Sequence, residues 1–154
     1  IHFAFVGEGV LLPELLARAG KMRRCNVSLL GFQPQPILDQ LLAQADAALV
    51  TLKPGMHRYC YPSKTQTYLA AGCRLLAAVD EPSELATMIR ARQLGEVCPP
   101  DRPDLLAQAI LGLSGGPIMG PDDCLRARRA ALEFSEQVIV ARWLGLIRAV
   151  LGAA

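Results

Sequence analysis

The sequence has little of what nucleic-acid-binding proteins need. Aromatic residues make up 5% of its 154 residues and charged residues 19%. The 16 Lys and Arg nearly balance the 14 Asp and Glu, which leaves a net charge of +2. So few stacking side chains and so even a charge balance argue against nucleic acid as a partner.

Close cysteine spacing is also missing. The five cysteines contain no C-x-x-C pair and stand far apart, at Cys25, Cys60, Cys73, Cys98 and Cys124. This excludes a zinc ribbon and a thioredoxin-like redox site, and it favours reduced thiols in a cytosolic protein. No set of Cys, His and carboxylate residues has metal-ligand spacing, so we expect no metal.

The chain has no long uncharged apolar run. Its most apolar stretch, 138–154, is interrupted by Arg142 and Arg148, whereas a membrane-spanning helix needs about 20 largely uncharged residues. We therefore predict no transmembrane segment. The first residue is Ile1 rather than Met, from which we expect a fragment of a longer protein.

What the sequence does have is a regular alternation of short apolar runs and helical patterns. Apolar residues make up 52% of the chain, enough for one folded domain with a core. Strands are expected at 1–6, 27–31, 47–52, 75–79 and 95–98. Helices are expected at 11–18, 37–44, 62–71, 83–92, 101–113 and 122–132, and after Ser135. This order predicts an α/β, Rossmann-like, doubly wound parallel sheet of buried strands with helices on both faces.

Ligands of such sheets bind where the strands end. Gly7-Glu8-Gly9 follows the first strand, but Leu12 stands where a dinucleotide-binding turn has its third glycine. The two glycines let the backbone approach a ligand. The alternative is a strand-to-helix turn that binds nothing.

Pro62-Ser63-Lys64-Thr65 is the stronger signal. Free backbone N–H groups and the helix dipole favour an anion at a helix start, and Lys64 adds a full positive charge. The pattern predicts a diphosphate cradle; the alternative is a helix cap with a solvated lysine. The preceding loop carries further basic groups, His57 and Arg58, for a phosphate or a sugar carboxylate, unless it is an ordinary surface loop.

These motifs occur in a recognisable order. Phe5-Val6-Gly7-Glu8-Gly9 is followed by 26–32, by 45–50, and by Pro62-Ser63-Lys64 with 68–76. The order resembles the C-terminal half of family-4 GT-B glycosyltransferases, and the likeness runs through most of the chain. Leu52-Lys53-Pro54-Gly55-Met56 is most similar to the branch that transfers amino- or deoxysugars in bacterial polysaccharide assembly.

The resemblance implies that the chain binds the nucleotide-sugar donor of a retaining, metal-independent glycosyltransferase. It places Phe32 beside the nucleobase, usually uracil, and Ser63 and Lys64 at the diphosphate. The implied donor-binding residues are Gly7, Glu8, Gly9, Phe32, Lys53, Arg58, Ser63, Lys64 and Thr67. The resemblance implies no cofactor and no metal, because the helix dipole and basic side chains would neutralise the leaving diphosphate. The expected leaving group is UDP.

The chain departs from the family's pattern at a pair of glutamates. Tyr59 and Thr67 stand where many relatives have these carboxylates. A non-catalytic partner subunit with a degenerate donor site is therefore the alternative function. An epimerase of the same architecture is a third, but only His57 offers it a catalytic residue.

The resemblance also implies that residues 1–154 form a single donor-binding domain. The domain's first strand and the N-terminal acceptor domain, with most catalytic residues, would precede Ile1, so the fragment would not be active alone. The last helix, 135–154, would pack toward that missing domain, unless it packs on its own sheet. The acceptor would be a sugar or a lipid-linked precursor, in the cytoplasm or at the inner membrane.

Overall fold

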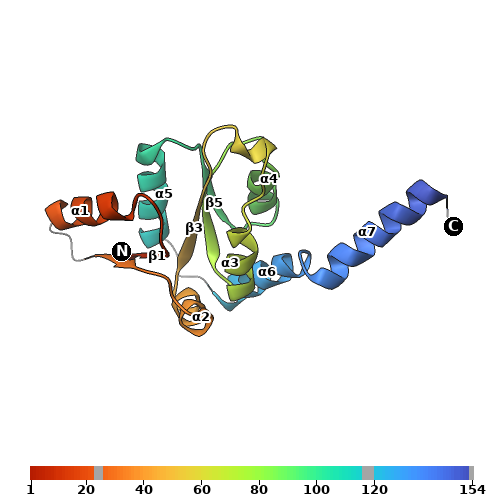
Figure 1. Cartoon of the computed structure of the whole chain (residues 1–154), viewed down its shortest axis with the longest axis horizontal. Coiled ribbons are helices and arrows are strands. Elements are labelled where there is room, and N and C mark those ends of the chain that lie inside the picture. The colour runs from red at the N-terminus through yellow and green to blue at the C-terminus, as the bar shows by residue number, and fades with distance from the viewer. Residues whose placement is uncertain (23–25, 116–119, 153–154) are drawn as a thin grey trace. The chain divides into compact units, whose positions relative to one another are not determined.

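A computed structural model describes residues 1–22, 26–115 and 120–152. The chain forms two compact units, Ile1–Leu41 and Leu42–Ala154, coloured along the sequence in Figure 1. Cys25, one of the five cysteines, lies outside the described residues.

The first unit is built on a pair of parallel strands. β1 (Phe3–Val6) pairs with β2 (Val27–Leu30), with Phe3 opposite Val27, and α1 (Leu12–Met22) connects them. None of the described residues of this unit is buried, and Phe5 is 46% exposed. The expectation of buried strands is therefore wrong for β1 and β2, because the described side chains of this unit do not enclose both faces of the strand pair.

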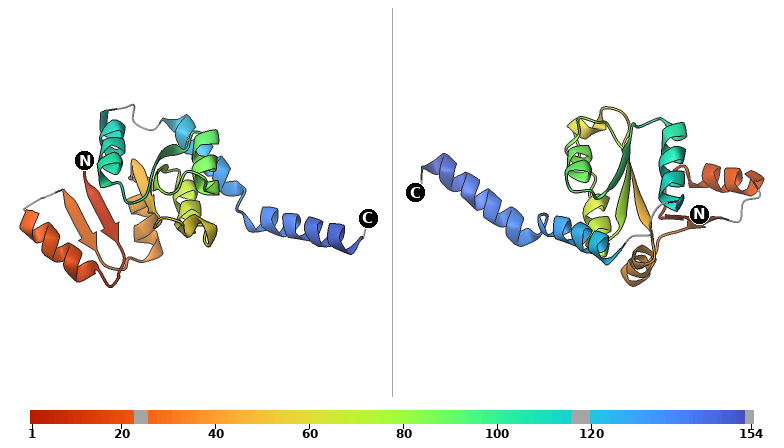
Figure 2. Two further views of the ribbon diagram at one scale, coloured as in Figure 1. Left: turned by 90° about the horizontal axis from the view of Figure 1, so that it is seen from above. Right: turned by 180° about the vertical axis from the view of Figure 1, so that it is seen from behind.

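The second unit contains a three-stranded parallel sheet. Its order is β3-β4-β5, formed by β3 (Ala47–Thr51), β4 (Arg74–Ala78) and β5 (Gly95–Cys98). α2 (Gln35–Ala43) leads into this sheet along the chain. α3 (Lys64–Ala71) and α4 (Glu84–Ala91) lie on one face, and α5 (Pro103–Gly115) lies on the other (Figures 1 and 2).

The core of the second unit fills the space between β4 and its covering helices. The largest fully buried apolar side chains are Leu69, Leu75, Val79, Leu85 and Ile89. α6 (Pro121–Leu132) packs on α3 and contributes Ala127 and Ala130 to the same core. Burial of these side chains is the main source of stability for this unit.

The predicted α/β class and the parallel pairing are confirmed. The strands are divided between two sheets. In the described part of the chain, β1 pairs only with β2, and β3 pairs only with β4. The expected start of the helix at 83–92 and the expected end of the helix at 62–71 both coincide with caps. The Ser83 side chain accepts a hydrogen bond from the Ala86 N–H, and Gly72 ends α3 at φ 88°.

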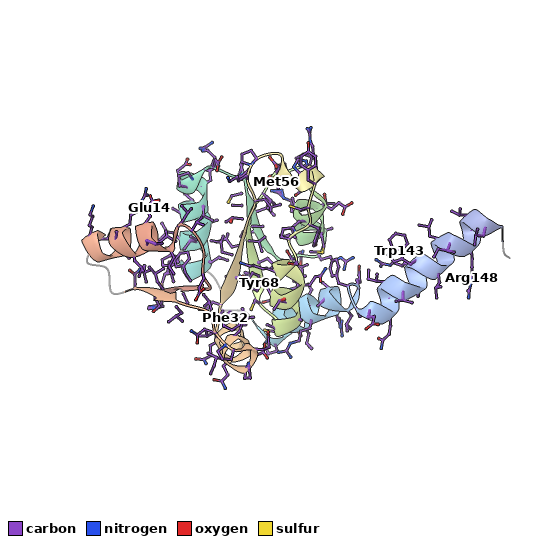
Figure 3. The ribbon with its side chains drawn as sticks, in the orientation of Figure 1. Glu14, Phe32, Met56, Tyr68, Trp143 and Arg148 are labelled. Carbon is purple, nitrogen blue, oxygen red and sulfur yellow. The ribbon has the colours of Figure 1, made fainter. Side chains whose placement is uncertain are left out.

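The last helix, α7 (Glu136–Leu151), has no buried residue. Figure 3 labels Trp143 and Arg148 on it, and Trp143 is 61% exposed. In the structure α7 thus buries none of its side chains, and the surface on which it packs stays a prediction. Among the described residues, no helix is both long enough and apolar enough to span a membrane.

Candidate functional site

The carboxyl ends of β3, β4 and β5 form one edge of the three-stranded sheet. Backbone hydrogen bonds keep the neighbouring strands paired up to this edge. The Leu52 N–H donates to the Ala78 carbonyl, and the Val79 N–H donates to the Cys98 carbonyl, both at 3.0 Å. A hollow of about 280 Å³ opens here, lined by Thr51, Leu52, Ala78, Leu106 and residues 99–103. The edge is where parallel α/β sheets bind ligands.

Three cationic side chains stand in the segment that follows β3. Lys53 and Arg58 belong to the loop between β3 and α3, and Lys64 is the first residue of α3; all three are exposed. In the described ranges, none of them forms an ion pair with a carboxylate. Their charge is thus left for an anionic ligand.

The start of α3 has no side-chain cap. Ser63 takes the N-cap position, but its side chain makes no capping hydrogen bond, and the Thr65 and Gln66 N–H groups donate instead to the Pro62 and Ser63 carbonyls, at 3.0 and 3.1 Å. Ser63 is exposed, as is Thr67 one turn later on the same helix. Positive partial charge at the helix start and the charge of Lys64 favour the same kind of ligand, an anion.

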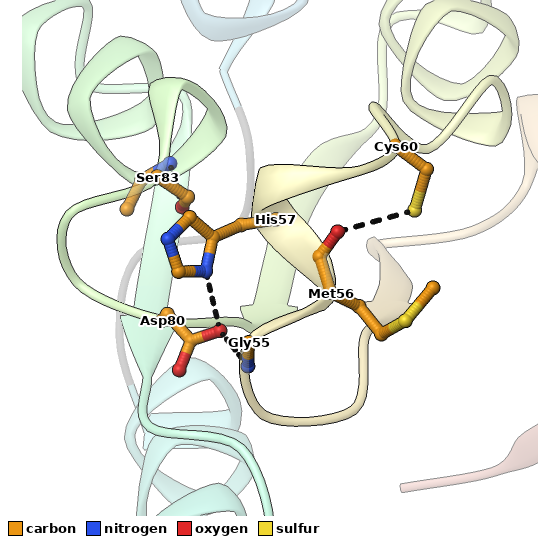
Figure 4. A network of polar contacts seen from close by, with 7 residues as sticks. Gly55, Met56, His57, Cys60, Asp80 and Ser83 are labelled. Carbon is orange, nitrogen blue, oxygen red and sulfur yellow. Dashed lines mark hydrogen bonds and ion pairs between the residues drawn. The ribbon is translucent and has the colours of Figure 1, made fainter.

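One carboxylate holds the loop that carries these groups (Figure 4). Asp80, which follows β4, accepts hydrogen bonds at Oδ2 from the Gly55 N–H at 2.8 Å and from His57 Nδ1 at 2.7 Å. The His57 hydrogen bond, and after it the Gly55 N–H, lower the pKa of Asp80 below its usual value. Asp80 is therefore an ionised acceptor at neutral pH.

The sequence singled out His57 as a basic group of the loop, but not its pairing with Asp80. The two residues are 23 positions apart. They meet because β3 and β4 are parallel neighbours with Thr51 opposite Ala78. The sequence did carry a signal for this contact. The strands predicted at 47–52 and 75–79 follow one another along the chain, so the loops after them could have been expected to lie side by side.

The other predicted donor-binding residues lie at the carboxyl edge of β1 and β2, in the first unit. Gly7 follows β1 with φ 125°, a conformation that favours glycine, and its N–H donates to the Leu30 carbonyl at 2.9 Å. Added Cβ atoms at Gly7 and Gly9 would meet nothing within 4 Å. Glu8 is exposed, and so is Phe32, by 78%. The structure thus brings these four together at one edge, and Lys53, Arg58, Ser63, Lys64 and Thr67 together in the other unit.

A larger hollow, of about 590 Å³, lies at the opposite edge of the three-stranded sheet, between the end of α4 and α6. Arg92 there forms a bidentate ion pair with Glu133, at 2.5 and 2.7 Å, and this pair lowers the pKa of Glu133. Arg126 pairs with Asp123 through a single contact. Two of the three arginines that line this hollow therefore have a carboxylate partner, whereas among the described residues Lys53, Arg58 and Lys64 at the carboxyl edge have none.

Neither position of the family's glutamate pair carries a carboxylate. Tyr59 is 82% exposed and Thr67 is exposed. Among the residues that the structure describes, no three His, Cys, Asp or Glu side chains gather as a metal site would require. The groups at this edge that can stabilise negative charge are Lys53, Arg58, Lys64 and the start of α3.

The chain is similar to known glycosyltransferases in sequence and in fold. It is 33% identical over 108 residues to WbjE of Pseudomonas aeruginosa, described as a probable glycosyltransferase, in an alignment covering 70% of this chain and 27% of that protein. AviGT4, a glycosyltransferase involved in avilamycin A biosynthesis, matches 99% of this chain with a TM-score of 0.67 and 22% identity. The chain spans 44% of that structure. No protein-family model matches the chain.

Proposed function

We propose that this chain, a GT-B domain related to the glycosyltransferases, is the part of such an enzyme that holds the nucleotide-sugar donor. One observation carries the proposal: among the described residues, Lys53, Arg58 and Lys64 have no carboxylate partner, and they stand at the strand ends of the second unit beside the start of α3. A diphosphate is the group of a sugar donor that such a site suits best.

The chemistry that follows is stabilisation of a leaving group. When the bond between the sugar and the diphosphate breaks, negative charge grows on the departing phosphate oxygens. Lys64 and the positive end of the α3 dipole would stabilise that charge more than they stabilise the intact donor. We propose that this charge replaces a metal ion and that the transfer retains the configuration of the sugar.

In the first unit, we propose that Phe32 contacts the nucleobase, with uracil as the favoured base. Its exposure of 78% leaves a ring face open for stacking. Gly7, Glu8 and Gly9 are proposed to contact the phosphates or the sugar, because Gly7 and Gly9 have open space where a side chain would start.

The rest of the enzyme is proposed to bind the acceptor, a sugar or a lipid-linked precursor in polysaccharide or glycoconjugate synthesis. The relatives support this, because the chain spans 27% of one and 44% of the other. The exposed apolar side chains of α7 are proposed to pack on that second part. We propose that the enzyme works in the cytoplasm or at the inner membrane surface.

Calorimetric titration of this chain with UDP tests the proposal. GDP and ADP serve as controls, and parallel titrations contain EDTA or MgCl₂. We expect saturable binding of UDP that EDTA does not abolish. Absence of binding to all three nucleotides would contradict a working donor site in this chain.

The Lys64→Ala substitution tests the proposed diphosphate contact. Losing a charged hydrogen bond to phosphate should weaken UDP binding by about 1–3 kcal/mol. Lys21→Ala is the matched control, because Lys21 is an exposed lysine in the last turn of α1. Equal UDP affinity of Lys64→Ala and Lys21→Ala would remove Lys64 from the site.

A non-catalytic partner subunit is the second candidate. The observation that favours it is the replacement of both carboxylates by Tyr59 and Thr67. A subunit of this kind would bind no nucleotide but would bind another glycosyltransferase chain tightly. Failure of all three nucleotide titrations, together with a stable complex in size-exclusion chromatography, would favour this function.

A further inference from the structure

The loop between β3 and α3 is held at a single carboxylate oxygen. Oδ2 of Asp80 receives both the Gly55 backbone N–H and His57 Nδ1, as the dashed lines in Figure 4 show. The side chains of His57 and Asp80 are 16% and 21% exposed. Little water competes for these two hydrogen bonds, so they constrain the loop more than exposed contacts would.

The geometry fixes the proton of the histidine. An ionised carboxylate can only accept hydrogen bonds, so His57 Nδ1 must carry a hydrogen and donate it to Asp80. In the neutral ring, Nε2 is then the unprotonated nitrogen. A carboxylate that selects a histidine tautomer in this way also fixes the orientation of the ring.

The same carboxylate fixes the backbone on both sides of Met56. Gly55 adopts φ 78°, and the single turn η1 (Met56–Arg58) begins immediately after it. Within this turn the Arg58 N–H donates to the Gly55 carbonyl, and the Tyr59 N–H donates to the Met56 carbonyl. Arg58 and Tyr59 therefore leave the loop in directions set by the bonds to Asp80.

We infer that Asp80 is a positioning residue of the proposed donor site, acting through Gly55 and His57 to hold Arg58 where it meets the donor. The inference rests on the proposed function. Asp80 itself does not touch the donor in this role. Its Oδ2 atom is already hydrogen-bonded to the loop.

The two hydrogen bonds to Asp80, called the clamp below, can be measured without any ligand. Long-range ¹⁵N–¹H NMR spectra of the wild-type chain should show His57 as the Nδ1–H tautomer at pH values where the ring is neutral. The Gly55 amide should exchange slowly with solvent. In Asp80→Ala both signatures should be lost, whereas Glu81→Gln, which removes an exposed neighbouring carboxylate paired with Arg90, should keep both.

UDP titrations then measure positioning. Asp80→Ala and His57→Leu should each weaken UDP binding by about tenfold, because a displaced loop must be reordered on binding. His57→Asn keeps an N–H donor close to the position of Nδ1, so it should restore most of the affinity lost in His57→Leu. Glu81→Gln should bind UDP as the wild type does.

Each outcome decides the inference. Loss of Gly55 protection in Asp80→Ala with unchanged UDP affinity would overturn the positioning role. Equal loss in His57→Asn and His57→Leu would also overturn it, because the hydrogen bond would then not be the cause. If Asp80→Ala does not fold, the two His57 variants decide alone. If the wild-type chain binds no UDP, the proposed function fails, and the positioning role falls with it even where the NMR signatures of the clamp are present.

Discussion

Thr65 carries a buried hydroxyl in the first turn of α3. Thr65 is 0% exposed, and within the described part of the chain its Oγ1 atom has no hydrogen-bond partner. Desolvating a hydroxyl without replacing its hydrogen bond is unfavourable. Thr65→Val keeps the shape and removes the hydroxyl, so we expect the free energy of unfolding to rise by up to about 1 kcal/mol. Urea denaturation of both proteins measures the difference.

Thr65→Ala is the control for this substitution. It also removes the hydroxyl but leaves a space in the packing, so it should lower the free energy of unfolding by about 1 kcal/mol. If Thr65→Val destabilised the chain as much as Thr65→Ala, the hydroxyl would have to make a stabilising hydrogen bond. A role for Thr65 in ligand binding would show as weaker UDP binding by Thr65→Val.

At this scale, much of the candidate site could be predicted from the sequence. Ser63 and Lys64 were expected at a helix start, and the structure confirms that start. The hydrogen bond between His57 and Asp80 could not be predicted, because it depends on the register of two neighbouring strands. Whether Lys64 touches a donor stays a prediction, since residue type and position do not identify a ligand.

Among the elements, β5 is constrained by its first residue. Gly95 has φ 152°, and a Cβ added there would lie 1.8 Å from the backbone carbonyl oxygen of Leu75 on β4. Backbone cannot move away as a flexible side chain can, so Gly95→Ala should separate the two strands. We expect a loss of about 2–4 kcal/mol in the free energy of unfolding.

Gly112→Ala is a matched control for this glycine. Gly112 lies within α5, and an added Cβ there would meet nothing within 4 Å. Alanine in a helix should therefore stabilise the chain by about 0.5–1 kcal/mol. Thermal denaturation should show melting temperatures that shift in opposite directions. Similar melting temperatures for the two variants would show that β5 adapts to a side chain at position 95.

The elements themselves could be predicted because short apolar runs and helix caps are local signals. β5 has the predicted bounds, and α3 ends at Ala71 as expected, where Gly72 caps it. Burial could not be predicted in the same way. The run at 1–6 is as apolar as the run at 75–79, but only the latter is covered on both faces. Coverage depends on neighbours that are distant in sequence.

At the scale of the whole molecule, burial is distributed unequally between the two units. Every buried residue lies within Leu42–Ala154, and none of the described residues of Ile1–Leu41 is buried. Helix α7 also lacks a buried residue, although it belongs to the second unit. Because hydrophobic burial is the main stabilising contribution, local stability should follow the same distribution.

Native-state hydrogen exchange tests this distribution. Amides of β1 and β2 should exchange through opening reactions whose free energy is lower, by about 2 kcal/mol or more, than that of β4. The side chains of β4 fill the core of the second unit. Amides of α7 should exchange as rapidly as those of β1, because helical hydrogen bonds without tertiary packing open readily. If β1, β4 and α7 shared one opening free energy, the chain would unfold as a single cooperative body. That outcome would contradict the link between burial and local stability, because the exposed side chains of Phe5 and Trp143 would then have to stabilise their elements as buried side chains do.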